Sequence, residues 1–159
     1  MLFWKNRRSF TSLRSAAVAL PGVIAIACFG LFVHRSGAAE PALVIVNSAN
    51  PVSGMHAEEV SEAFLKKAPR WPDGVEIVPV DLSEGSAVRE AFSRRVHSKP
   101  AAAVKAYWQR MIFSGREVPP PEKATGADVV AFVRTNRGAI GYVGIDTVLG
   151  SGVKVIRID

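Results

Sequence analysis

Cysteine and histidine are scarce in this sequence, and their scarcity excludes several kinds of site. Cys28 is the only cysteine among 159 residues, and it lies inside an apolar N-terminal run. Neither a disulfide nor a thiol nucleophile can therefore operate in the rest of the chain. Beyond residue 39 the only histidines are His56 and His97, which are far apart and have no acidic or cysteine partner at metal-ligand spacing. We expect neither a bound metal nor a cofactor.

The motifs of several common enzyme classes are also missing. The chain has no Gly-x-Ser-x-Gly nucleophile elbow, no Gly-x-x-x-x-Gly-Lys phosphate loop and no dinucleotide-binding glycine pattern. Acidic residues are plentiful, but Glu58, Glu59 and Glu62 fit the solvated face of a helix. No second acid pairs with them at a defined spacing, as general acid–base catalysis would require. We therefore predict that the protein is not an enzyme.

The positive charge is concentrated at one end of the sequence. The formal net charge is +6, and residues 1–39 contain five basic residues and no acidic one. These are Lys5, Arg7, Arg8, Arg14 and Arg35. Basic and acidic residues nearly balance in the remainder, so the basic composition does not indicate a nucleic-acid-binding surface. We predict no nucleic-acid partner.

Residues 1–39 have the pattern of an export or anchoring segment. A cationic start precedes an apolar run over residues 16–33, and the small residues Ser36-Gly37-Ala38-Ala39 follow. This run is long for a signal-peptide core and just long enough for a membrane span. Two fates stay open: cleavage after Ala39, or retention as an apolar helix that anchors the protein in the inner membrane. Either fate places residues 40–159, the predicted folded domain, in the periplasm or another extracytoplasmic location.

Residues 40–159 alternate between strand-like and helix-like patterns. We predict strands over residues 42–46, 75–80, 139–143 and 153–158, and helices over residues 57–67, 87–96, 100–112 and 125–137. The first run is apolar without alternation, which is typical of a strand covered on both faces, as in parallel sheets. Helix 100–112 carries a wide apolar stripe that includes Tyr107, Trp108 and Ile112, and we expect this stripe to be buried. The predicted fold is a three-layer α/β domain with a mostly parallel sheet flanked by helices.

The stretch from residue 75 to residue 92 is the best candidate for a ligand site. An apolar strand breaks into the polar Ser83–Ser86 loop, and an amphipathic helix then begins at residue 87. Unpaired backbone amides and the positive end of the helix dipole favour an anion at such a helix start. The predicted oxyanion ligands are the amides of residues 85–88, the Ser83 and Ser86 hydroxyls, and the Arg89 guanidinium, with Gly85 in the turn.

Three motifs resemble those of one protein family. They are Val60-Ser-Glu-Ala-Phe-Leu-Lys-Lys with Trp71-Pro-Asp-Gly, Glu84-Gly-Ser with Arg89-Glu-Ala-Phe, and Gly138-Ala-Ile-Gly-Tyr-Val. In this order the chain resembles the phosphate-type solute-binding proteins of ABC transporters, within the periplasmic-binding-protein superfamily. The resemblance covers residues 43–157 but only one lobe of a two-lobe family. It implies a short form of the fold, with the single lobe preceded by the N-terminal apolar segment.

The resemblance also implies a function. A phosphate-type domain would bind phosphate or a similar oxyanion and would act with an ABC permease or a second envelope protein. Gly85 and Ser86 match the family's Gly and its hydroxyl residue, whereas Glu84 and Val80 stand where the family has a Ser and an Arg. A carboxylate near the site opposes an anion, and the absent cation would have offset its desolvation.

The alternative is a ligand-free interaction or scaffold module of the envelope that keeps one binding-protein lobe. Such a module would contact another envelope protein through the loop of residues 47–54 or through the proline-rich loop of residues 114–124.

Overall fold

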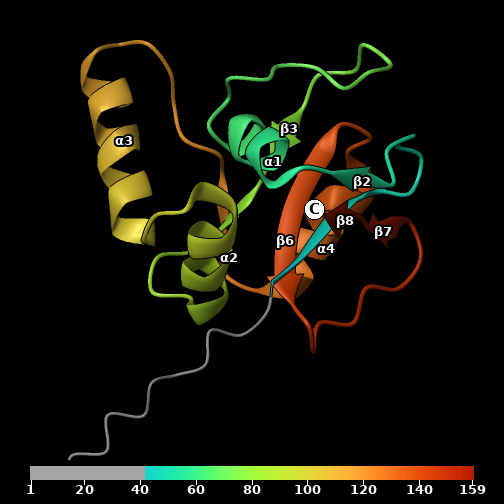
Figure 1. Ribbon diagram of the computed structural model, residues 1–159. Helices are drawn as coiled ribbons and strands as arrows, with labels where there is room; N and C mark the ends of the chain where they lie inside the picture. The colour runs from blue at the N-terminus through green and yellow to red at the C-terminus, as the bar shows by residue number, and fades with distance from the viewer. Residues whose placement is uncertain (1–41) are drawn as a thin grey trace, which may run out of the picture. The chain divides into compact units, whose positions relative to one another are not determined.

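The computed structural model describes residues 42–159 (Figure 1). The predicted leader, its cleavage site and the apolar helix over residues 16–33 lie outside the described residues. Among residues 42–159, no helix combines the length and the apolar character that crossing a bilayer demands.

Strands and helices alternate along most of the described chain. In order, the elements are β1 (Ala42–Asn47), β2 (Gly54–Met55), α1 (Ala57–Phe64), β3 (Val78–Pro79), β4 (Asp81–Leu82), α2 (Ala87–His97), α3 (Ala101–Phe113), β5 (Glu122–Lys123), α4 (Gly126–Thr135), β6 (Ala139–Gly144), β7 (Val153–Val155) and β8 (Arg157–Ile158). All four predicted helices are present, with ends within a few residues of the predicted ones.

The central sheet is mixed, so the prediction of a mostly parallel sheet is wrong for this sheet. Its strand order is β3-β6-β1-β7. β1 pairs antiparallel with both β6 and β7, and only β3 runs parallel to β6. The two small sheets, β2–β8 and β4–β5, are parallel. An apolar run without alternation indicates that both faces of a strand are covered. It does not indicate whether the strand runs parallel or antiparallel to its neighbours.

Helices cover both faces of the central sheet. A Cβ added to Gly141 in β6 would lie 2.6 Å from Val129 of α4, so this position faces α4. The next residue, Tyr142, stacks on Phe92 of α2 with ring centroids 3.9 Å apart and lies 5.7 Å from Phe64 of α1. Because consecutive residues of a strand point to opposite faces, α4 forms one outer layer and α1 and α2 form the other. Figure 1 shows α4 partly behind β6 and α2 to the left of it.

Only part of the strand predicted over residues 75–80 joins the central sheet, and a second short strand follows directly after residue 80. Val78 and Pro79 pair with β6, whereas Asp81 and Leu82 pair with β5 at the end of the proline-rich loop. The sequence predicted residues 114–124 as a loop, and β5 lies within it. The pairing of β4 with β5 brings Glu122 beside Asp81.

Helix α3 is less buried than its apolar stripe predicted. Val104 and Trp108 are buried, but Ile112 is 50% exposed and Phe113 is 89% exposed. The helix packs against α2 rather than against the sheet, so only part of the wide stripe finds a partner. Figure 1 shows α3 at the left edge of the domain, beyond α2.

Candidate functional site

The Ser83–Ser86 loop is held in place by backbone hydrogen bonds. The Ser83 amide donates to the Lys123 carbonyl at 2.9 Å, and the Ser86 amide donates to the Ser83 carbonyl at 3.3 Å. Gly85 has φ +84°, a left-handed conformation that favours glycine. The loop therefore reverses the chain tightly between β4 and α2.

The start of α2 leaves backbone donors free. Ser86 is the N-cap residue, and its hydroxyl accepts from the Arg89 amide at 3.3 Å. Within residues 42–159 the amides of Gly85, Ala87 and Val88 donate no hydrogen bond. These three amides and the positive end of the α2 dipole form an anion-compatible arrangement.

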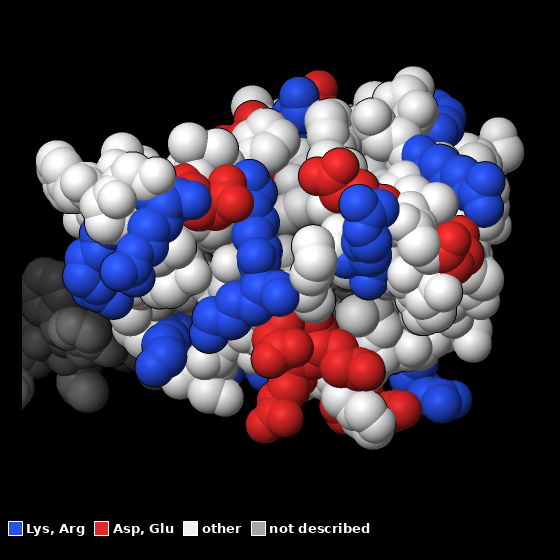
Figure 2. Space-filling model, turned by 90° about the horizontal axis from the view of Figure 1, so that it is seen from above, with Lys and Arg blue, Asp and Glu red and all other residues white. Residues whose placement is uncertain are grey.

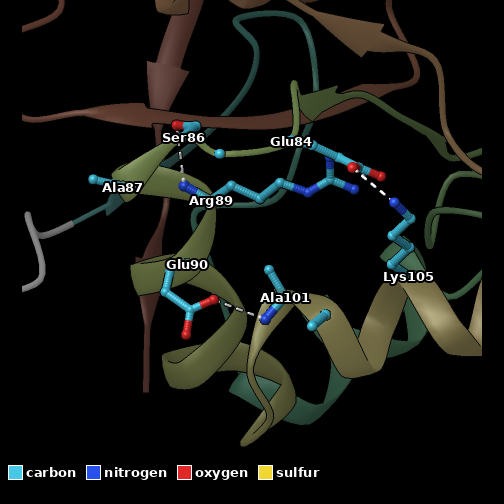
Figure 3. Close-up of a pocket in the computed structure, with 9 residues that line it drawn as sticks. Glu84, Ser86, Ala87, Arg89, Glu90, Ala101 and Lys105 are labelled. Carbon is cyan, nitrogen blue, oxygen red and sulfur yellow. Dashed lines mark hydrogen bonds and ion pairs between the residues drawn. The ribbon is translucent and has the colours of Figure 1, made fainter.

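A cavity of about 400 Å³ opens beside this helix start. Residues of the loop, of α2 and of the start of α3 line it, as Figure 3 shows. The lining residues are Glu84, Gly85, Ser86, Ala87, Arg89, Glu90, Ala101, Ala102 and Lys105. Of the predicted ligands, Gly85, Ser86 and Arg89 contribute to the cavity wall. Ser83 does not, although its carbonyl supports the turn.

The charges around the cavity are already paired in part. Lys105 donates to Glu84 at 2.8 Å, and this hydrogen bond is the main reason why the pKa of Glu84 is lowered. Glu90 accepts from the Ala101 amide at 2.9 Å and forms an ion pair with Arg94 at 2.7 Å. The site therefore offers amide donors to an anion, but its two carboxylates oppose one.

The Arg89 guanidinium is committed to neighbouring strands. Arg89 is 7% exposed; its Nη2 lies 2.9 Å from Asp81, and its Nη1 lies 2.6 Å from Glu122. Nη1 also donates to the Leu82 carbonyl at 2.7 Å. Burial acts to lower the pKa of Arg89, but the Asp81 and Glu122 carboxylates outweigh it, so the pKa is raised. The lone arginine of the predicted site thus ties α2 to β4 and β5.

Asp81 lies at the centre of this buried network. Its carboxylate accepts from the Tyr142 hydroxyl and from the Leu82 amide. Burial raises the pKa of Asp81, whereas Arg89 and these two donors act in the opposite direction. Burial, together with the adjacent carboxylate, also raises the pKa of Tyr142, which keeps its hydroxyl a donor at neutral pH. Sequence reasoning missed Asp81, Glu122 and Tyr142. The available signal was a carboxylate that directly follows an apolar strand.

A metal centre is not built from the described residues. Among residues 42–159, no group of three or more His, Cys, Asp or Glu side chains is arranged to hold an ion.

Solved structures with the same fold include two bacterial binding proteins. One, from Clostridium perfringens, is described as a phosphate ABC transporter substrate-binding protein with bound phosphate; it is 21% identical over 76% of this chain, with a TM-score of 0.59. The other, an ABC-type phosphate transport receptor from Vibrio cholerae, is 20% identical over 75% of this chain, with a TM-score of 0.58. This chain covers only 45% and 46% of them, so it spans less than half of their length.

Sequence comparison assigns the family. No curated protein matches this chain significantly. The family model for the PBP superfamily domain matches residues 22–155, which is most of the sequence. The resemblance inferred from the three motifs is confirmed, and the chain belongs to the PBP superfamily domain family.

Proposed function

We propose that residues 40–159 form a solute-binding domain of the cell envelope that holds phosphate or a similar oxyanion at the start of α2. The observation that carries this proposal is the set of free amides at Gly85, Ala87 and Val88 beside an open cavity of about 400 Å³. The similarity to proteins described as phosphate-binding supports the choice of ligand. Binding and release of a solute require no chemical step, so the proposed role is not enzymatic.

The proposed site uses amides and a hydroxyl more than cations. Gly85 and Ser86 line the cavity, while Arg89 reaches it with part of its side chain and directs its guanidinium to Asp81 and Glu122. Without a free arginine, an oxyanion is held by charge–dipole interactions and hydrogen bonds that compete with water. We therefore expect a dissociation constant of about 1 mM for the isolated protein.

A second wall would strengthen this site. The chain spans less than half the length of the matched binding proteins, and its cavity is open on one side. We propose that an ABC permease or a second envelope protein supplies the missing wall, which would exclude water from the anion. The domain would meet this partner outside the cytoplasm, either as an exported protein or anchored through residues 16–33.

Isothermal titration of the purified protein with phosphate and with sulfate tests the proposal. The informative variant is Ala87→Pro, which removes one amide donor at the first position of α2. Proline is well tolerated there, and the extended Ser86 backbone (φ −65°, ψ 125°) suits a residue before proline. Loss of one of three amides should weaken phosphate binding about threefold to tenfold.

Ala87→Gly is the matched control because it changes the same side chain and keeps the amide. It should bind phosphate within about twofold of the wild type. No detectable heat at about 10 mM phosphate, or equal affinities for the Pro and Gly variants, would reject the amide site.

A further inference from the structure

A second cavity lies where α1, the end of α2 and α3 converge. It has a volume of about 500 Å³. The stripe of Ala103, Ala106, Tyr107 and Arg110 forms its α3 wall, and Leu65 of the α1 end lies opposite. The Tyr107 hydroxyl donates to the Leu65 carbonyl at 3.4 Å, which bridges the two sides. The walls are therefore mainly apolar and half-buried.

The charged residues of this groove are all basic. Lys67, Lys99 and Arg110 line it, and no Asp or Glu does. Among the residues that the structure describes, none of these three cations forms an ion pair. Figure 2 shows the domain from above, where basic side chains gather over the left part of the surface with some acidic ones among them. An apolar groove with three unpaired cations is electrostatically complementary to an anion.

This groove is distinct from the site at the start of α2. Ala101, Ala102 and Lys105 of α3 line that first cavity, whereas the stripe that begins at Ala103 lines the second. The first cavity contains two carboxylates and free amides, so it suits a small oxyanion. The second cavity has apolar walls as well as cations, so it suits a larger ligand.

The basic residues of the groove indicate which kind of ligand it can bind. Residues 1–39 contain five basic residues and no acidic one, so their charge does not complement a basic groove. Inorganic phosphate or sulfate would not cover the apolar walls, which would stay in contact with water. A volume of about 500 Å³ falls within the range of small-molecule pockets. We propose that this groove binds a small organic anion, with its apolar body against α3 and its carboxylate or sulfonate group near Lys99 and Arg110.

Titration with 8-anilinonaphthalene-1-sulfonate tests the proposal, because this fluorescent probe joins an apolar body to one sulfonate. The folded protein should bind it saturably, with one site. Lys99→Gln and Arg110→Gln should each weaken binding about threefold to tenfold. Ala106→Trp, which fills the groove, should abolish the saturable signal. Far-ultraviolet circular dichroism and a thermal melt of each variant show whether it is folded.

Two control variants make the test specific. Arg116→Gln removes an exposed cation that does not line the groove, and Phe113→Ser removes the most exposed aromatic ring near it. Both should bind the probe within about twofold of the wild type. Absence of saturable binding, or a loss in Phe113→Ser without a loss in the Lys99 and Arg110 variants, would overturn the proposal. Ala87→Pro should leave probe binding unchanged, so failure of the phosphate site and failure of this groove are distinguishable.

Discussion

Removal of the Arg89 guanidinium should destabilise the domain strongly, because it leaves a buried carboxylate without its ionic partner. Asp81 is only 7% exposed, and Arg89 is its ionic partner at 2.9 Å. Breaking a buried ion pair by deleting one member typically costs about 3–5 kcal/mol. Arg89→Met keeps most of the aliphatic stem, so this cost reflects the lost charge and the lost hydrogen bond to the Leu82 carbonyl rather than a cavity.

Urea denaturation at pH 7 measures this loss. Trp71 and Trp108 are buried, so their fluorescence should report unfolding, and linear extrapolation gives the free energy of unfolding. We expect Arg89→Met to lower that free energy by about 3–4 kcal/mol, which is a large part of the stability of a small domain. Arg137→Met is the matched control. Arg137 pairs with Asp73 at 3.1 Å, but its side chain is 64% exposed, and its loss should cost less than about 1 kcal/mol.

Replacing the buried carboxylate by a neutral amide should restore part of the lost free energy of unfolding. In the double variant Asp81→Asn with Arg89→Met, no uncompensated charge remains buried, so the double variant should be more stable than Arg89→Met alone. If Arg89→Met lost less than about 1 kcal/mol, or if the exposed control lost as much, the buried network would not have the role assigned to it.

Three further predictions address pH, packing and ligand affinity. Burial lowers the pKa of His97 to about 4. Since the unfolded state takes up a proton near pH 6.5, stability should fall by about 2 kcal/mol as the pH drops from 6.5 to 4, and His97→Asn should lose less in urea melts over this range. A Cβ added at Gly138 would lie 2.0 Å from the Glu76 carbonyl oxygen, so Gly138→Ala should cost about 3 kcal/mol by the same assay. Glu84→Gln removes a carboxylate at the helix start and frees Lys105, so phosphate should bind about threefold to tenfold more tightly by calorimetry. An unchanged or weaker affinity would place the anion elsewhere.

The helices were predictable because their signals are local. Ser86 caps α2 and Thr125 forms a capping box with Asp128 at α4, and both are residue types that favour a helix start. Strand direction was not predictable, since β1 and β6 are covered on both faces and show the same apolar run in either orientation. The strand formed by Asp81 and Leu82, just after the predicted 75–80 strand, depends on pairing with a segment about 40 residues further along the chain, and no local pattern encodes that contact.

The candidate site was predictable only in its backbone part. A polar loop with Gly85 before an amphipathic helix indicates a helix start, and the structure places Gly85 and Ser86 beside a cavity. The buried network around Arg89 was not visible, because Glu122, which pairs with Arg89, comes from the proline-rich loop, and Tyr142, which donates to Asp81, comes from β6. A single arginine near a helix start can serve a ligand or a buried carboxylate, and only the tertiary pairing decides between them.

The central claim, that an oxyanion is held by the backbone at the start of α2, is tested most directly by an NMR titration of ¹⁵N-labelled protein with phosphate at constant ionic strength. The account predicts saturable shifts concentrated at the amides of Gly85, Ala87 and Val88, with sulfate acting similarly and chloride much more weakly. Amides of residues 85–88 that stay unshifted at about 10 mM phosphate, or shifts centred on another part of the fold, would contradict it.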